Sequence, residues 1–206
     1  MRFTRAAAVA TAALTTSMLA AAPASAHGTG TRSLASVLTA GKAGFDRNGH
    51  DYDILRSAVL AVLKAKPSSP VKVLTDGKTR LTAFLPNDRA FQLLVADLRK
   101  SKRLPGEQQA FTAVAGLGIG TVESVLLYHV VPGATIDRKA AYKADGASLK
   151  TAAGSAVKVD VSWWRVTLVD ADRDDRNPRV VRFDINKGNR QIGHGVDRVL
   201  RPADLP

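Results

Sequence analysis

The clearest pattern in the chain is an apolar repeat with helical spacing that begins just after residue 51. Six apolar residues recur at three- and four-residue intervals: Ile54, Leu55, Ala58, Val59, Val62 and Leu63. This spacing predicts an amphipathic helix, and Asp51 is the expected N-cap. Pro67 and Pro70 end the helix, and the apolar residues at 71–74 predict a short strand.

A second strand and helix follow directly. Residues 81–85 form an apolar run that predicts a buried strand, which Pro86 closes. Asn87 or Asp88 is expected to cap the next helix. Four residues lie on one face of that helix: Phe91, Leu94, Val95 and Leu98.

The middle of the chain predicts two further helices that lead into a strand. Residues 107–115 form the first helix, and a glycine-rich stretch interrupts it before Thr121, the expected N-cap of the second. Residues 128–131 have the β-branched and aromatic bias of a strand. We expect Phe84, Phe91 and Leu126 to share one hydrophobic core.

The last third of the chain is rich in predicted strands. A short helix is expected over 137–143, and alternating residues then predict two strands that are joined near Trp163 and Trp164. Further strands are expected over 180–185 and from residue 192 onward. The domain is therefore helical first and β-rich last, which indicates an α+β fold.

Three motifs occur in a fixed order along the domain: LTAFLPNDRAF at 81–91, LLYHVVPG at 126–133 and IGHGVDRVL at 192–200. Together they resemble the fasciclin-type (FAS1) domain, an extracellular adhesion and interaction module. The resemblance implies a twisted β-wedge or sandwich covered by the helices of the N-terminal half, over residues 51–206. Gly193 and Gly195 replace residues that are usually β-branched in the family, so we expect a looser final strand.

Two segments precede the predicted domain. Residues 1–26 combine Arg2 and Arg5, an uncharged apolar run and an Ala-Ser-Ala cleavage site, as is typical of a secretory signal peptide. Residues 27–50 are small, polar and glycine-rich, and we expect a flexible leader. The sequence contains no cysteine, so disulfides and lipid-anchoring thiols are excluded. No segment after the signal peptide is expected to span a membrane.

The chain is strongly basic. Without Arg2 and Arg5, 28 basic residues face 18 acidic ones, which gives a formal charge of +10. Such a charge favours polyanions, including acidic polysaccharides. The densest basic cluster is Arg99, Lys100, Lys102 and Arg103. The cations are otherwise spread along the chain, so no specific nucleic-acid site is expected.

The two histidines within the predicted motifs are His129 and His194. A catalytic interpretation would make one of them a general base with Ser124 or Asp197 as its partner. The chain has no G-x-S-x-G elbow, no H-E-x-x-H motif and no cysteine nucleophile. We therefore predict no catalytic, cofactor or metal site, and expect both imidazoles to form structural hydrogen bonds.

Two aromatic pairs are candidates for partner contact. The resemblance implies adhesion through Tyr128 and His129, although strand alternation directs at least one of them inward. Trp163 and Trp164 are suited to stacking on a sugar ring, and the same alternation predicts one buried and one exposed tryptophan.

An acidic stretch from Asp170 to Asp175 suggests a calcium loop as an alternative. The glycine and the final glutamate of an EF-hand are missing. Arg173, Arg176 and Arg179 are expected to neutralise these carboxylates instead.

The sequence thus predicts a secreted, non-catalytic fasciclin-like module that binds surface or matrix proteins or acidic polysaccharides. The alternatives are a small secreted hydrolase and a non-specific polyanion-binding scaffold. A hydrolase would turn over ester or glycoside substrates, and a polyanion-binding scaffold would bind in a manner sensitive to salt.

Overall fold

The structure, a computed structural model, describes residues 29–41 and 44–203. The predicted signal peptide lies outside the described residues. The helices are α1 (Leu34–Thr39), α2 (Asp53–Ala65), the 3₁₀ helix η1 (Pro70–Thr75), α3 (Asp88–Leu98), α4 (Glu107–Gly116), α5 (Ile119–Tyr128) and α6 (Arg138–Lys143). The strands are β1 (Leu81–Pro86), β2 (Val130–Pro132), β3 (Ser148–Lys150), β4 (Ala156–Ser162), β5 (Arg165–Val169), β6 (Val180–Ile185) and β7 (Gln191–Val196).

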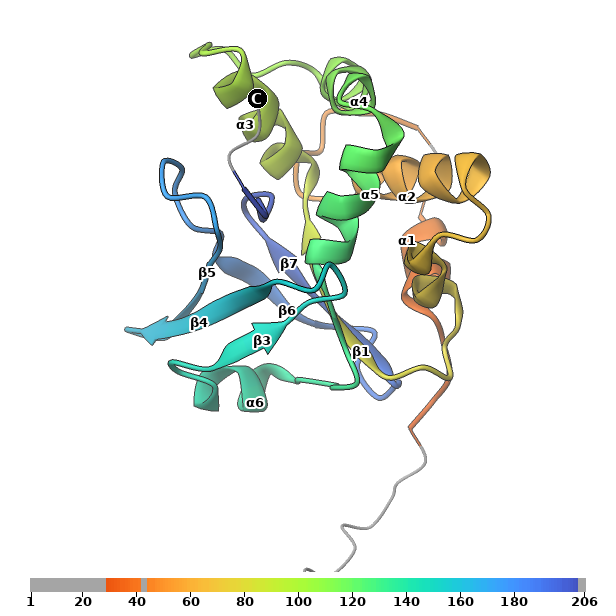
Figure 1. Cartoon of the computed structure of the whole chain (residues 1–206), viewed down its shortest axis with the longest axis vertical. Helices are drawn as coiled ribbons and strands as arrows, with labels where there is room; N and C mark the ends of the chain where they lie inside the picture. Colours follow the sequence, from red (N-terminus) through yellow and green to blue (C-terminus); the bar gives the residue numbers. More distant parts are fainter. Residues whose placement is uncertain (1–28, 42–43, 204–206) are drawn as a thin grey trace, which may run out of the picture.

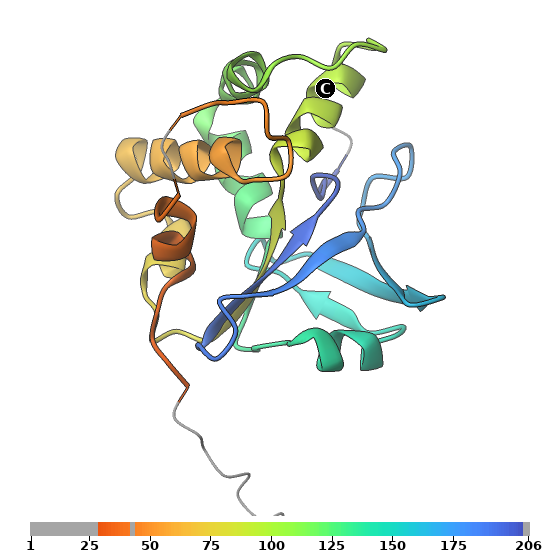
Figure 2. The same ribbon diagram turned by 180° about the vertical axis from the view of Figure 1, so that it is seen from behind.

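Two sheets and a layer of helices make up the domain (Figure 1). One sheet has the strand order β2-β1-β7-β6, and the other has the order β3-β4-β5. The sheets open like a wedge on one side of the molecule, and helices α1 to α5 cover the other side, as the reverse view also shows (Figure 2). The predicted α+β architecture is confirmed.

Strand β1 lies in the interior of the first sheet because it pairs on both edges. It runs antiparallel to β2 and parallel to β7, with Leu81 opposite Gln191 and Pro86 opposite Val196. The first and third sequence motifs are therefore side by side although about 100 residues separate them. All six residues of β1 and all six of β7 are buried.

The two faces of β1 contribute to different hydrophobic clusters. Leu81, Ala83 and Leu85 pack with the helices, together with Phe91 and Leu126. Phe84 points to the opposite face and packs between the sheets with Tyr128 and Val196. The prediction that Phe84 shares one core with Phe91 and Leu126 is therefore wrong, because successive side chains of a strand point to opposite faces.

Capping explains where α2 and α3 begin. Asn87 caps α3 as predicted, since its side-chain oxygen accepts from Ala90 N at 2.9 Å. The start of α2 is capped from a distance. The Asp88 carboxylate accepts from Asp53 N at 3.2 Å and from Ile54 N at 2.9 Å. Asp88 therefore caps α2 in place of Asp51, which the sequence predicted as its N-cap.

Three predicted boundaries are corrected by local backbone geometry. The segment expected as a strand at 71–74 belongs to η1, where Pro70 occupies the first turn and Ser69 Oγ accepts from Val71 N at 3.2 Å. Helix α5 starts before Thr121, after Gly118 with its φ of 89°. Tyr128 is the last residue of α5 instead of the first of a strand.

Strand β7 is central and buried, and the looser pairing that we expected occurs only on its β6 side, where the register shifts at Gly193 and Gly195. A Cβ atom at Gly193 would lie 2.6 Å from Leu85 Cδ1, and one at Gly195 would lie 2.3 Å from the Tyr52 hydroxyl. The two glycines therefore allow close packing of the helical layer on this strand. The pairing of β7 with β1 is regular, whereas its pairing with β6 has register shifts.

The described part of the leader packs on the domain, which differs from the flexible segment that we expected. Leu34 in α1 is fully buried, and its N–H donates to Gln191 Oε1 at 2.8 Å. Gly30 forms a bridge with Asn189. A buried leucine and a backbone hydrogen bond hold α1 against the first sheet.

Candidate functional site

The tip of the β4–β5 hairpin carries two exposed tryptophans. Trp163 is 91% exposed and Trp164 is 87% exposed. They form the two-residue turn between the paired residues Ser162 and Arg165, and their φ angles are 47° and 64°. Strand alternation predicted one buried and one exposed tryptophan. That prediction is wrong because both residues lie in the turn, where left-handed backbone sends both side chains outward.

Helix α6 supports the hairpin from the side. The Tyr142 hydroxyl donates to the carbonyl oxygen of Trp164 at 3.0 Å, and the two rings meet edge to face at a centroid distance of 6.5 Å. The Arg138 guanidinium lies 5.6 Å from the Tyr142 ring centroid and 5.4 Å from that of Phe183. These contacts position the turn against α6 and β6.

We call this region the hairpin–α6 surface: Trp163, Trp164, Arg165, Arg138, Lys139, Tyr142 and Lys143. All four of its cations are exposed. Sequence reasoning found the tryptophans but missed the contribution of α6. The sequence pattern did not indicate this grouping, because α6 and the β4–β5 hairpin are separate elements that lie side by side only in the tertiary structure (Figure 1).

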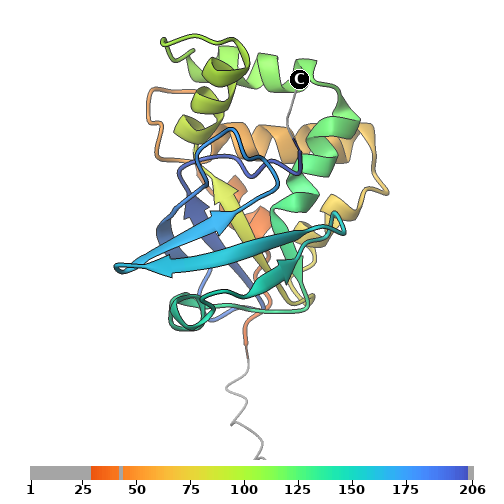
Figure 3. The same ribbon diagram turned by 60° about the vertical axis from the view of Figure 1, so that its left-hand side comes forward.

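The predicted basic cluster Arg99, Lys100, Lys102 and Arg103 lies elsewhere. Its residues follow α3 and are exposed, and none of the four takes part in an ion pair within the described residues. The α3–α4 connection and the hairpin tip lie at different ends of the molecule in all three views (Figure 3). The structure therefore does not join these cations with the tryptophans in one site.

The predicted contact pair Tyr128 and His129 lies in the interior. Tyr128 is fully buried between the two sheets, and its hydroxyl donates to the carbonyl oxygen of Ala156 at 3.2 Å. His129 is 3% exposed. Neither ring therefore forms part of the surface of the folded domain.

Both ring nitrogens of His129 are used by the backbone. Nδ1 donates to the carbonyl oxygen of Val125 at 2.7 Å, and Nε2 accepts from Leu200 N at 2.9 Å. Burial lowers the pKa of His129 to about 4, although the bond to Val125 acts in the opposite direction. The neutral imidazole thus joins the end of α5 to the segment after β7.

His194 has the same kind of role on β7. Nε2 donates to the carbonyl oxygen of Ile136 at 2.7 Å, and Nδ1 accepts from Asp184 N at 3.3 Å. Burial lowers its pKa as well. The proposed catalytic partner Asp197 accepts from Arg179 N at 2.7 Å. Neither imidazole has a ring nitrogen left to act as a general base in this arrangement.

The acidic stretch from Asp170 to Asp175 is held by arginines that follow β7. Arg201 contacts Asp172 at 2.9 Å and Asp175 at 3.1 Å, and Arg198 contacts Asp175 at 2.8 Å. Burial raises the pKa of Asp172, but backbone N–H donors and Arg201 outweigh it and lower the pKa overall. Asp172 and Asp175 are therefore paired with Arg198 and Arg201 instead of the predicted Arg173, Arg176 and Arg179.

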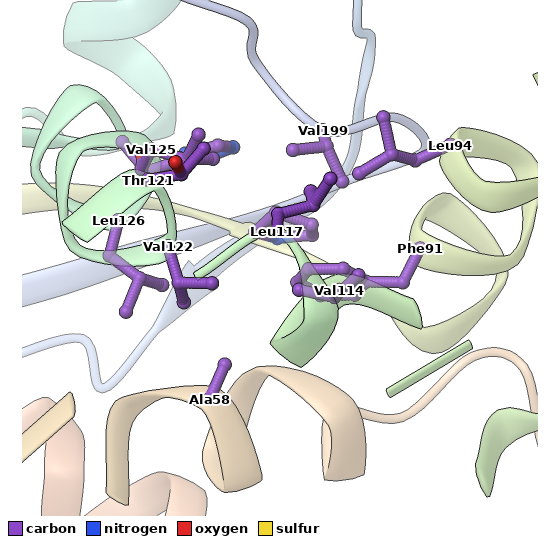
Figure 4. Close-up of a pocket in the computed structure, with 12 residues that line it drawn as sticks. Ala58, Phe91, Leu94, Val114, Leu117, Thr121, Val122, Val125, Leu126 and Val199 are labelled. Carbon is purple, nitrogen blue, oxygen red and sulfur yellow. The ribbon is translucent and has the colours of Figure 1, made fainter. Parts of the chain in front are cut away.

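A small internal cavity lies where α2, α3, α4 and α5 meet. Its volume is about 20 Å³, and side chains such as Phe91, Val122 and Val199 line it (Figure 4). A space of this size holds about one water molecule, and its apolar walls offer that water few partners. The cavity is therefore a packing defect of the helical layer and no ligand site.

None of the described helices is by itself long and apolar enough to cross a membrane. Helices α4 and α5, which are bent by 106° at their junction, meet the length and composition requirement only when taken together.

Comparison with known proteins adds a family and a fold. The profile described as "Fasciclin domain" matches residues 57–202. Among solved structures, the chain is similar to a FAS1 domain pair from the insect cell adhesion molecule fasciclin I, with a TM-score of 0.50 and 20% sequence identity. That match covers 70% of this chain and 46% of the other, so the similarity extends over about half of the domain pair. No curated protein matches the chain at a significant level.

Proposed function

Because the chain belongs to the fasciclin domain family, we propose that it is a secreted, non-catalytic binding module that adheres to acidic polysaccharides of the cell surface or matrix. The observation that carries this proposal is the hairpin–α6 surface. Two tryptophans that are 91% and 87% exposed stand beside four exposed cations. The FAS1 domain pair with a similar fold belongs to a cell adhesion molecule, which supports an adhesive role for this chain.

The chemistry of the hairpin–α6 surface fits an acidic sugar polymer. Indole faces pack on the apolar face of a sugar ring, and arginine and lysine pair with carboxylate or sulfate groups. An extended polymer reaches both kinds of group at once because the cations flank the turn. The basic charge of the whole chain adds long-range attraction that salt screens.

Backbone strain at the turn also supports a binding role. Non-glycine residues with positive φ are uncommon, and bulky aromatic residues pay more for this conformation than asparagine or glycine do. Trp163 and Trp164 both adopt it, and neither ring is buried in return. The strain is consistent with selection for contact instead of folding stability.

The test compares two variants that each lose four positive charges. One changes Arg138, Lys139, Lys143 and Arg165 to Gln, and the other changes Arg99, Lys100, Lys102 and Arg103 to Gln. Retention on a heparin-like matrix across a salt series measures their affinity. We expect both to elute at lower salt than the parent, and the hairpin variant to lose more.

A third variant removes the rings without changing charge. Trp163→Ala with Trp164→Ala should weaken binding about 10- to 30-fold, as loss of a central aromatic contact typically does. Its melting temperature should stay near that of the parent because both rings are exposed. Parent-like retention of this variant, or retention of the parent that is indifferent to salt, would contradict the proposal.

A further inference from the structure

Five carboxylates gather where the segment before α2 meets the starts of three helices. They are Asp46, Asp51, Asp53, Asp88 and Glu107, out of 18 acidic residues in a strongly basic chain. One oxygen each from Asp46, Asp51 and Asp53 lies within 4.8 Å of the others. The same holds for the buried trio of Asp53, Asp88 and Glu107, so Asp53 belongs to both groups.

The fold holds these side chains in place. Asp53, Asp88 and Glu107 are the first residues of α2, α3 and α4. The preceding segment is tied to the same helices, because Asp46 N donates to Glu107 Oε2 at 2.7 Å and Asp88 N donates to the carbonyl oxygen of Asp51 at 3.0 Å. The geometry of the cluster is therefore fixed by backbone contacts.

Two of the oxygens in this cluster are buried without a hydrogen-bond partner in the described structure. They are Asp51 Oδ1 and Glu107 Oε1, and the Glu107 residue is only 2% exposed. A buried carboxylate oxygen without a donor is costly, and a bound cation would satisfy both oxygens. Arg56 offsets part of the charge by pairing with Asp53 at 3.0 Å.

We propose that this cluster binds one Ca²⁺ ion. Calcium takes six to eight oxygen ligands at about 2.3–2.6 Å, so oxygens on opposite sides of one ion are about 4.8 Å apart. The oxygens within each trio lie within this limit of one another, and Asp53 belongs to both trios. The flexible geometry of Ca²⁺ suits ligands that come from separate elements, whereas Mg²⁺ demands near-ideal octahedral geometry. A groove of about 550 Å³, lined in part by Asp46, Asp51 and Asp53, gives the ion and its waters access.

The proposed site is not an EF-hand. Asp46, Asn48 and Gly49 fit the third, fifth and sixth positions of that loop, but Gly44 and Leu55 occupy its first and last positions. Asp88 and Glu107, contributed by other helices, replace the missing ligands. The ligands are far apart in the sequence, whereas the acidic residues at 170–175 are consecutive enough to resemble a calcium loop.

The first experiment measures melting temperature with and without 10 mM CaCl₂, with NaCl at equal ionic strength as the reference. For an ion held at a dissociation constant of about 0.1–1 mM, as in extracellular calcium modules, the parent should gain roughly 3–10 °C. Glu107→Gln and Asp51→Asn should each lose most of this gain. Both variants should fold, because each change relieves repulsion between carboxylates while keeping an acceptor oxygen.

Two further measurements make the test specific. Asp160→Asn, at an exposed position on β4, should keep the full calcium response. Terbium luminescence excited through tyrosine should appear in the parent and fade in Tyr52→Phe, because Tyr52 lines the same groove. Absence of a calcium-dependent shift, an equal shift with MgCl₂, or a parent-like shift in Glu107→Gln would overturn the proposal.

Discussion

His129 joins two parts of the chain that are 71 residues apart, through its bond with Leu200 N. Only the neutral ring can accept that bond, since protonation places a hydrogen on Nε2. The low pKa of His129, about 4, is therefore a property of its position. The histidine of the most recognisable sequence motif acts as an architectural residue.

His129→Ala should cost about 2–4 kcal/mol of unfolding free energy at pH 7.5, because it leaves a cavity and an unpaired Leu200 N–H. The folded pKa of about 4 lies below the ordinary value of 6.5, so the unfolded chain takes up the proton first as the pH falls. The contribution of His129 is therefore complete above pH 6.5 and is lost toward pH 4. The cost of the substitution should shrink by about 2 kcal/mol at pH 4.5.

Urea denaturation of parent and variant at the two pH values measures this difference. Comparing the two proteins cancels the opposite effect of Asp88, whose raised pKa of about 8 favours folding at low pH. His50→Ala, at an exposed histidine, should stay within about 0.5 kcal/mol of the parent at both pH values. An unchanged cost of His129→Ala between the two pH values would argue against the neutral ring.

At the scale of elements, β7 shows how a departure from a family pattern serves packing. Its two glycines face the helical layer, where Leu34, Leu85 and the Tyr52 hydroxyl approach the strand. A glycine normally weakens a strand, but here it lets α1 and the start of α2 lie close to the sheet. The compensation comes from the full burial of β7 between β1 and β6.

Gly193→Val should destabilise the domain by about 1–3 kcal/mol, because its Cβ would lie 2.6 Å from Leu85 Cδ1. Gly120→Ala is the matched control, since its Cβ meets nothing within 4 Å and the residue lies in α5. That control should be neutral or stabilise the protein by up to about 1 kcal/mol. Thermal melts of both variants give the comparison. A stable Gly193→Val would mean that the side chains of Leu85 and Leu34 do not crowd this position in solution.

At the scale of the whole molecule, Arg201 holds three distant segments together. Its guanidinium contacts Asp97 at 2.7 Å at the end of α3, and Asp172 and Asp175 in the connection between β5 and β6. Arg201 is 6% exposed and Asp172 is 4% exposed. The pair therefore closes the domain at its C-terminal end within a region that salt screens weakly.

Arg201→Met should cost about 3–5 kcal/mol, because it leaves the buried carboxylate of Asp172 without its cation. Arg198→Met, which loses a more exposed pair with Asp175, should cost about 1 kcal/mol or less. The urea midpoint should fall in both variants with an unchanged m-value. Equal costs for the two would show that burial does not decide the strength of these pairs.

Sequence alone determined the features that depend on local spacing. Apolar periodicity gave α2 and α3, Asn87 gave the cap of α3, and the order of the three motifs gave the α+β fold and the family. The helices and the cap follow from neighbours within a few turns, where propensity and period act directly, and the family follows from the motif strings themselves.

Tertiary structure decided the features that join residues far apart in the chain. The parallel pairing of β1 with β7 defines both core clusters and separates Phe84 from Phe91. The turn at Trp163 exposes both rings, and α6 supplies their basic surroundings. The five carboxylates and the Arg201 contacts combine residues from separate elements. Local hydrophobic periodicity does not predict these long-range contacts. The burial and the electrostatic environment of each residue depend on which segments pack together in the folded domain.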